Sequence, residues 1–188
     1  MLNVTAFYTT VTNAQVPTLI LPDAVTITRN TGKLTSKGIE AEINSTPAKG
    51  FEINYSFGYT DAKYNRLKVG GNGSETDLKG NRQIFTPDFT SMLAAQYSLP
   101  LCKKHELNFI LRGEWKYIGT QYFDLANTLK QSSYSLLNTR AGIAAKNFEL
   151  MFYGRNLTSE KYISYAYDFG GVHLGDPLTW GISLKGKF

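Results

Sequence analysis

Apolar and polar residues alternate with a period of two along much of this chain. Residues 51–60 read Phe-Glu-Ile-Asn-Tyr-Ser-Phe-Gly-Tyr-Thr, with an apolar residue at every odd position. Because successive side chains of a strand point to opposite faces, this pattern predicts a strand with one apolar face. The same alternation returns in residues 107–117 and 178–188.

Extended over the chain, the pattern predicts an all-β fold of about nine antiparallel strands. We expect short turns at 12–15, 46–50, 100–105 and 145–147, and long loops at 65–83, 123–131 and 158–176. Short turns at one end and long loops at the other are typical of outer-membrane β-barrels, with the long loops outside. The strands are expected at about 2–12, 15–21, 25–46, 50–64, 84–99, 105–122, 132–145, 147–157 and 177–188.

Strand length and aromatic placement also favour a transmembrane barrel. Several strands exceed the roughly 5–6 residues usual in soluble proteins, whereas a membrane-crossing strand needs about 9–11. Phe188 closes the last alternation, where we expect it to be read by the barrel-insertion machinery. A soluble β-sandwich or lipocalin-like barrel also alternates and stays open as an alternative. The aromatics expected at the membrane interface are Tyr59, Tyr64, Trp115, Tyr117, Trp180 and Phe188.

Composition supports strands and argues against several functions. The chain of 188 residues has 12 Tyr, 11 Phe and 17 Gly but only 6 Pro, a balance that suits strands joined by turns. Its net charge is +5, yet Lys and Arg are scattered without a long basic run, so we expect no nucleic-acid partner. No segment reaches the roughly 20 apolar residues that a membrane helix needs.

Nothing in the sequence indicates catalysis or a resident metal. Cys102 is the single cysteine, and the histidines, His105 and His173, are far apart in sequence. There is no Gly-x-Ser-x-Gly elbow and no phosphate-binding loop. We therefore predict no enzyme activity, no metal site and no cofactor.

Several stretches, taken in order and spacing, resemble the C-terminal barrel region of TonB-dependent receptors across essentially the whole chain. Asn30 and Gly32 in the first of them suit a bend or β-bulge. The matching stretches are Asn30-Thr31-Gly32-Lys33, Lys37-Gly38-Ile39-Glu40-Ala41-Glu42, Tyr59-Thr60-Asp61-Ala62-Lys63-Tyr64, Pro87 at the start of a strand, Gly154-Arg155-Asn156-Leu157-Thr158 with Tyr162, and Gly175-Asp176-Pro177-Leu178-Thr179-Trp180-Gly181.

The resemblance implies a barrel of about 22 strands around an N-terminal plug, energised from the inner membrane through TonB. We expect residues 1–188 to be the C-terminal portion of such a barrel, without plug, TonB box or signal peptide. Because bacterial single-chain barrels have even strand numbers, nine strands indicate a truncated gene, a fragment or a split chain. Transport by this chain alone is then not expected.

Two groups of residues are candidates for function. Lys79 and Arg82 could attract an anionic ferric chelate, and loop aromatics could stack on a flat ligand. The alternatives are a merely hydrated interior and loops that pack on themselves. The predicted ligand-binding residues are Lys79, Arg82, Tyr162, Tyr165, Tyr167, Phe169 and His173. The predicted lumen-facing residues are Glu40, Glu42, Arg112, Glu114, Lys116, Arg140 and Arg155.

The functional hypothesis is a segment of an energy-coupled nutrient receptor in the bacterial outer membrane. A ferric siderophore is the default ligand because it is the commonest substrate of the family, while cobalamin, haem and glycans stay open. The expected partners are outer-membrane lipid, the TonB complex through the absent plug, the insertion machinery and a ferric chelate. Alternatives are a passive channel, an adhesion barrel, a non-functional truncated fragment and a soluble β-barrel binding module.

Overall fold

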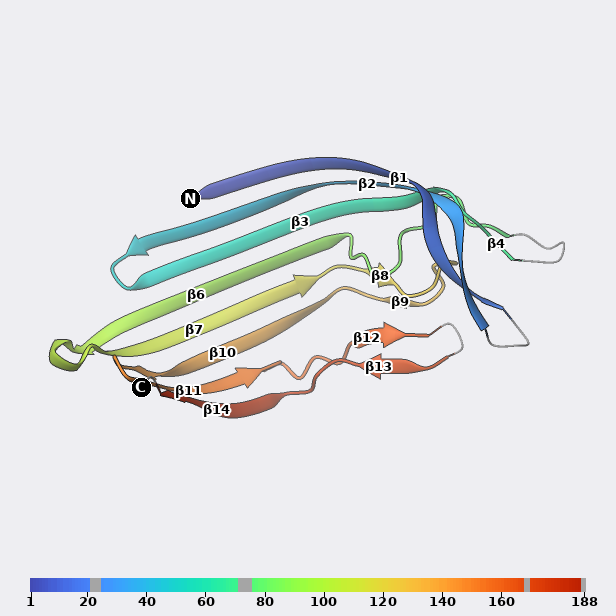
Figure 1. Cartoon of the computed structure of the whole chain (residues 1–188). Helices are drawn as coiled ribbons and strands as arrows, with labels where there is room; N and C mark the ends of the chain where they lie inside the picture. The colour runs from blue at the N-terminus through green and yellow to red at the C-terminus, as the bar shows by residue number, and fades with distance from the viewer. Residues whose placement is uncertain (21–24, 71–75, 168–169, 187–188) are drawn as a thin grey trace.

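The computed structural model describes residues 1–20, 25–70, 76–167 and 170–186. Its main element is an eight-stranded sheet whose strands follow one another in chain order, each antiparallel to the next (Figure 1). The strands are β1 (Leu2–Ile20), β2 (Val25–Ala48), β3 (Phe51–Arg66), β6 (Phe89–Cys102), β7 (Leu107–Ile118), β10 (Tyr134–Ala144), β11 (Phe148–Arg155) and β14 (Thr179–Gly186).

The two ends of the sheet differ as the sequence predicts. One end carries tight connections, among them a 3-10 turn at Lys103–His105. The other end carries long connections that contain small hairpins (Figure 1). In the described part of the chain, no helix is long and apolar enough to cross a membrane. The hairpins are β4 (Lys68–Val69) with β5 (Thr76–Asp77), β8 (Gln121–Tyr122) with β9 (Lys130–Gln131), and β12 (Ile163–Ala166) with β13 (Val172–Leu174).

The turn expected at residues 12–15 is wrong, because β1 continues through this region. The pairing passes from Thr12 opposite Lys33 to Ala14 opposite Gly32, which leaves Asn13 unpaired with a φ of 56°. Asn is one of the few non-glycine residues that adopt positive φ readily, so Asn13 forms a bulge inside one strand. The described sheet thus has eight strands, and the odd strand number no longer argues for a truncated chain.

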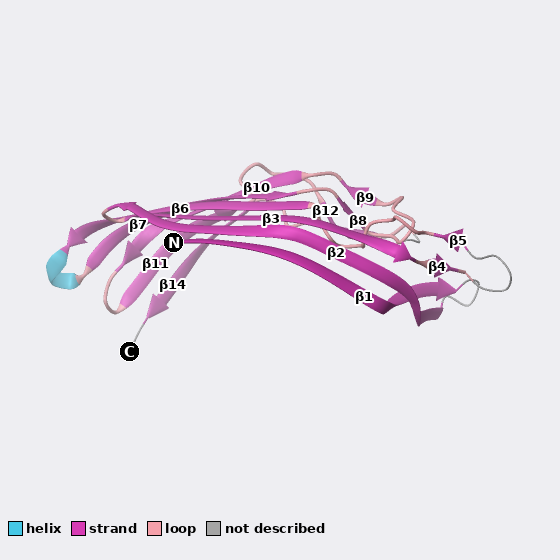
Figure 2. Cartoon of the chain, turned by 90° about the horizontal axis from the view of Figure 1, so that it is seen from above, coloured by secondary structure: helices cyan, strands magenta, loops and turns pink. Residues whose placement is uncertain are grey.

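A second irregularity lies across the ladder from Asn13. Ala14 pairs with Gly32 and Gln15 with Asn30, so Thr31 is left out of the register. This confirms the bulge expected at Asn30–Gly32. The β1–β2 hairpin bends sharply where the two irregularities meet (Figures 1 and 2).

The sheet is curved, with β1 and β14 on the two flanks of an arch (Figure 2). Residues paired across an antiparallel ladder lie on the same face, so the register assigns every strand position to one side. The convex face is apolar from β1 to β14 and largely exposed, which a soluble protein would avoid over so wide an area. Its exposed members include Val4, Ile39, Leu93, Leu111, Leu137, Phe152 and Ile182.

The largest cluster of buried side chains lies at the loop end of the sheet, not along its middle. Val16, beyond the bulge, packs with Leu34, Tyr64 and Leu67, and Leu67 is fully buried. Hydrophobic residues of the loops, such as Leu125, cover this cluster. Val16, which follows the bend at Asn13, is therefore packed against residues of the long connections.

Tyr64 corrects one of our predictions. We expected it at the membrane interface with Tyr59, yet it is only 6% exposed and belongs to the loop-end cluster. The reason is parity: Tyr59 and Tyr64 are separated by an odd number of positions in one regular strand, so they point to opposite faces.

Candidate functional site

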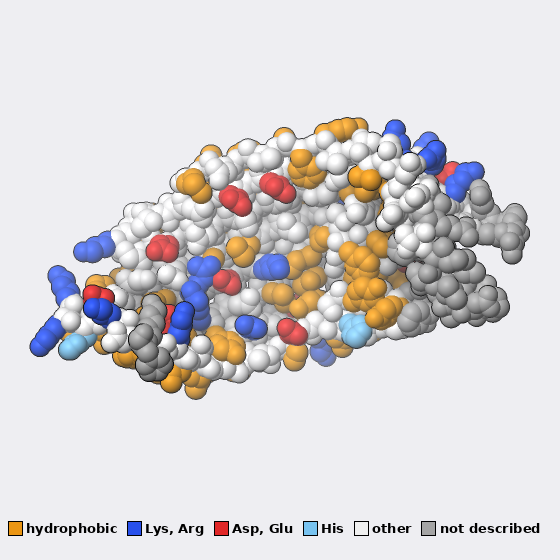
Figure 3. Space-filling view, in the orientation of Figure 1, with side chains coloured by type: hydrophobic (Ala, Val, Ile, Leu, Met, Phe, Trp, Pro, Cys, Tyr) orange, Lys and Arg blue, Asp and Glu red, His pale blue; other side chains and the backbone are white. Residues whose placement is uncertain are grey.

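The concave face of the sheet carries the charged residues predicted to line a lumen. The register places Arg112 opposite both Gln96 and Arg140, Glu114 opposite Asn138, and Lys116 opposite Met92, all away from the apolar face. Charged side chains lie across this hollowed face (Figure 3). That the face encloses a lumen stays a prediction. The residues found on it are Glu40, Glu42, Arg112, Glu114, Lys116, Arg140 and Arg155.

Hydrogen bonds link part of this set into a network across β2, β3 and β7. The Arg112 Nε donates to Glu114 Oε1 at 2.8 Å, and its Nη1 donates to Asn54 Oδ1 at 3.4 Å. The Asn54 amide in turn donates to Asn44 Oδ1 at 2.8 Å. Because each charge-assisted bond fixes a long side chain, the network gives this face a defined arrangement of charge.

Arg140 lies directly opposite Arg112 but has a different partner. Its Nη2 donates to Gln96 Oε1 at 3.3 Å. Nearby, the Arg155 guanidinium carbon lies 5.3 Å from the ring centre of Tyr153, a cation–π distance. These arginines line an open groove of about 1030 Å³ over β7, β10, β11 and β14. The groove lining also holds the carboxylates of Glu114 and Glu149, so its three arginines exceed its acidic groups by one.

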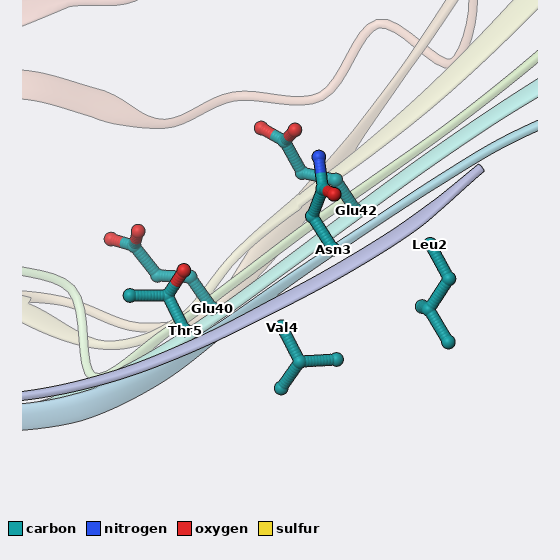
Figure 4. A pocket seen from close by; sticks show the side chains of 6 residues that line it. All are labelled: Leu2, Asn3, Val4, Thr5, Glu40 and Glu42. Carbon is teal, nitrogen blue, oxygen red and sulfur yellow. The ribbon is translucent and has the colours of Figure 1, made fainter.

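Glu40 and Glu42 lie apart from the arginine groove. They project from β2 beside Asn3 and Thr5, on the opposite side of the sheet from Leu2 and Val4 (Figure 4). Among the described residues, no hydrogen bond or ion pair joins them to the Arg112 network. The predicted lumen set therefore divides into an acidic part on β2 and a mainly basic part on β7 to β11.

An aromatic cluster joins three of the long connections at the loop end. The Phe85 ring stacks on Tyr165 with ring centres 5.0 Å apart and also contacts Phe123 at 5.7 Å. Tyr165 contacts Tyr167 at 4.6 Å, and His173 lies 5.9 Å from Tyr167. We call this group the loop aromatic cluster; its members are Phe85, Phe123, Tyr165, Tyr167 and His173. Phe85, Tyr165 and Tyr167 each keep more than a third of their surface exposed, so the cluster can receive a ligand.

The remaining ligand candidates are distributed differently. Tyr162 stacks on Tyr134 at 4.3 Å, outside the cluster. Phe169 lies outside the described residues, and Lys79 is exposed with its backbone N–H bound to Asp77. Arg82 donates from Nη2 to the Thr60 carbonyl at 3.0 Å, which fixes its head group beside β3. Their role in ligand steering stays a prediction.

Polar contacts tie the long connections to one another. The Arg82 N–H donates to Asn127 Oδ1 at 2.7 Å, and the Asn127 amide donates back to the Arg82 carbonyl at 3.1 Å. The Asn81 amide donates to the Leu125 carbonyl at 2.8 Å. From the next connection, the Ile163 N–H donates to the Gln131 side chain at 2.7 Å. The loops thus form one connected platform.

Asn156 holds the last long connection in place. It is 3% exposed and has a φ of 50°. Its amide donates to the carbonyls of Glu160 and Asp176, each at 2.9 Å, and its Oδ1 accepts from the Glu160 N–H at 2.8 Å. One side chain therefore closes both ends of the loop that carries Tyr165 and His173.

Aromatic rings form a band on the convex face. Phe57 contacts Phe89 at 4.8 Å, Phe89 contacts Tyr117 at 5.6 Å, and Tyr117 contacts Trp115 at 6.1 Å, across β3, β6 and β7. On β11 and β14, Phe152 stacks on Trp180 at 5.3 Å. The predicted interface residues Trp115, Tyr117 and Trp180 lie in these contacts. Tyr59 is exposed on the same face, and Phe188 lies outside the described residues.

Some residues of the site were not predicted from the sequence, because they lie far along the chain from the loop at 158–176. Phe85 and Phe123 complete the loop aromatic cluster, and Asn127 ties two connections together. Phe123 and Asn127 lay in the loop expected at 123–131, but Phe85 was assigned to the strand expected at 84–99, whereas the structure begins that strand, β6, at Phe89. No group of potential metal ligands occurs within the described part of the chain.

The family is now evident from sequence as well as from fold. The model of the family described as "TonB dependent receptor-like, beta-barrel" matches residues 1–157. This chain belongs to that family of outer-membrane receptor barrels, whose members are receptors and transporters and not enzymes.

Particular relatives agree with this assignment. The chain is 26% identical over 154 residues to the ferrichrome outer membrane transporter/phage receptor of Escherichia coli K12, covering 77% of this chain and 19% of that protein. It superposes over its whole length on 27% of the ferric yersiniabactin uptake receptor FyuA of Yersinia pestis, with a TM-score of 0.81 and 21% identity. It also superposes, over 97% of its length, on 25% of the siderophore receptor PiuA of Acinetobacter baumannii, with a TM-score of 0.74 and 24% identity.

The comparisons also show that this chain is much shorter than its relatives. The chain spans only about a fifth to a quarter of the length of these relatives. Its sheet corresponds to part of the wall of their barrels.

Proposed function

We propose that this chain forms part of the wall and outer loops of a receptor that takes up a ferric siderophore across the outer membrane. The observation that carries the proposal is the loop aromatic cluster, whose rings of Phe85, Tyr165 and Tyr167 stay exposed at the long-loop end of the sheet. Exposed rings offer stacking surfaces to a flat or aromatic chelate, and the arginines of the concave groove provide positive charge on the face that we expect to line the lumen. The functions of the relatives, ferrichrome transport and ferric yersiniabactin uptake, support this ligand class.

The partners follow from the same proposal. The apolar convex face contacts lipid, and its aromatic band lies at a membrane interface. Energy reaches the barrel from the TonB complex through a plug domain. Phe188 is the residue that we expect the barrel-insertion machinery to recognise.

Uptake of radioactive iron by cells that express the full-length protein tests the proposal. The double substitution F85A/Y165A removes the stacked pair. Each aromatic contact contributes about 0.5–1.5 kcal/mol, so we expect ligand affinity to fall about tenfold. The matched control is Tyr97→Ala, an equally exposed ring on the convex face. Equal uptake by the double variant and the control would refute ligand capture by the cluster.

The same assay separates a receptor from a passive channel. Uptake by an energy-coupled receptor stops when cells are de-energised, whereas a passive pore continues to equilibrate its solute. Energy-independent iron uptake through the unaltered protein would support the passive alternative.

A further inference from the structure

The long connections at the loop end are tied to one another in the order of the strands that carry them. The β1–β2 hairpin packs Val16 against residues of the next connection. That connection is joined to the third one by the hydrogen bonds between Arg82 and Asn127. The third is joined to the fourth by the bond from the Ile163 N–H to the Gln131 side chain. Each connection is therefore anchored on the one before it.

The fourth connection ends this series with a strand that has an open edge. Among the described residues, β13 (Val172–Leu174) pairs with β12 alone, and all three of its residues are exposed. The bond between Ile163 and Gln131 joins β12 to β9, and β13 lies beyond β12 from β9 (Figure 1). The open edge of β13 is therefore on the side of the platform where β14 lies.

The backbone of β13 presents N–H groups to this edge. On the β12 side, the Gly171 carbonyl accepts a hydrogen bond and the Gly175 N–H donates one, each at 2.8 Å. Hydrogen-bonded and non-hydrogen-bonded positions alternate along an antiparallel strand. The N–H groups of Val172 and Leu174 therefore point away from β12, in the direction that a further strand would occupy.

The side chains of this edge are apolar. Val172 is 54% exposed and Leu174 is 69% exposed. Proteins protect an edge strand with charged residues, with proline, or by covering it with another element. The sequence of β13 is Val-His-Leu and provides neither an acidic or strongly basic side chain nor a proline. Its protection therefore has to come from an element that covers it.

We propose that the free edge of β13 binds the outer connection of the strand that pairs with β14 in the closed barrel. β14 ends the described sheet, and a closed barrel leaves no strand edge unpaired, so another strand lies beside it. Because β13 leads directly into β14, the outer end of that strand emerges next to β13. The relatives are several times longer than this chain, which leaves room for such a strand.

The proposed segment adds to β13 as an extended strand. Main-chain hydrogen bonds to Val172 and Leu174 hold it, and its own apolar side chains cover theirs. The contact continues the series of ties between successive connections past the end of the described sheet. It does not depend on which solute the receptor takes up.

Hydrogen–deuterium exchange of the full-length protein in lipid nanodiscs, resolved to single amides, tests the contact without any variant. We expect the N–H groups of Val172 and Leu174 to exchange at least about tenfold more slowly than unbonded amides of the same sequence. Exchange of both groups at the unprotected rate would overturn the proposal.

The substitution Val172→Pro identifies the segment that covers the edge. It removes an N–H that points away from β12, so the bonds within the hairpin remain. We expect the Leu174 N–H to exchange about tenfold faster, together with one peptide in the outer connection beside β14. Val172→Ala keeps the N–H group and is the matched control, with a smaller effect expected.

The Gly175 N–H reports whether the hairpin itself stays folded, because it is bonded on the β12 side. If Gly175 stays protected in Val172→Pro, a response in a different connection, or in no second peptide, would assign the edge to another occupant and overturn the proposal. If Gly175 loses protection, the hairpin has opened, and the exchange of Val172 and Leu174 in the unaltered protein decides.

Discussion

At the scale of single residues, a few side chains hold the outer connections in place. Asn156 contacts Glu160 and Asp176 through its amide and accepts from the Glu160 backbone. Asp124 acts similarly one connection earlier, accepting from the N–H groups of Thr128 and Leu129 at 3.2 and 2.7 Å. Polar side chains thus provide the partners that regular pairing supplies within the sheet.

Asn156→Ala should release the last connection. The change leaves buried backbone groups without partners and puts Ala at a φ of 50°, so we expect a loss of about 3 kcal/mol in unfolding free energy. Urea unfolding of the full-length protein in lipid vesicles measures it. Asn3→Ala, an exposed position on β1, is the control and should change little. An unaltered midpoint for Asn156→Ala would show that Asn156 does not hold the loop.

The face of the sheet on which a residue lies could be predicted from the sequence wherever it depends only on even or odd spacing within one strand. The alternation separates Arg112 and Glu114 from Leu111 and Trp115, and the register agrees. Tyr64 was misplaced because its distance from Tyr59 was read as nearness along the strand, without regard to parity. Phe85 and Tyr165 meet across 80 residues of chain, and no local pattern encodes such a contact.

At the scale of elements, the β1–β2 hairpin is the clearest departure from expectation. A run of Thr-Asn-Ala-Gln suits a turn as well as a bulge, because Asn accepts positive φ in both. The choice between them depends on pairing partners that continue beyond Asn13, and those pairs are visible only in three dimensions. The tight connections and the small outer hairpins, in contrast, follow the predicted alternation of short and long.

The bulge can be tested by substitution at Asn13. A β-branched residue at positive φ is strained, so Asn13→Val should cost about 1–2 kcal/mol, whereas Asn13→Gly should be tolerated. Hydrogen exchange at Val16 and Leu34 reports the change, since both depend on the bend for burial. Equal protection in the two variants would mean that the bend does not need a positive φ.

At the scale of the whole molecule, the sheet presents two different surfaces to two environments. Leu93 and Met92 are neighbours on β6 but lie on opposite faces, with Leu93 paired to Trp115 and Met92 to Lys116. Such separation is the outer-membrane arrangement, with apolar residues outward and polar residues inward. It follows from the period-two pattern alone, which is why the fold class was predictable from the sequence.

Leu93→Arg and Met92→Arg form a matched pair for this arrangement. An arginine facing hydrocarbon near the middle of a barrel wall costs about 2–4 kcal/mol, whereas one facing a hydrated interior costs little. We expect Leu93→Arg to lower the unfolding free energy in vesicles by that amount and Met92→Arg to leave it nearly unchanged. The reverse order would place the membrane on the concave side.

The ties between the outer connections also bear on how such a receptor can evolve. Asn127 binds the backbone of Arg82, Phe85 stacks on Tyr165, and Ile163 binds Gln131, so each connection is anchored on another. A substitution that reshapes one loop removes a partner from its neighbour. Substitutions in one loop are therefore expected to be accompanied by substitutions in its neighbour. In particular, the residues at positions 85 and 165 should co-vary among natural sequences.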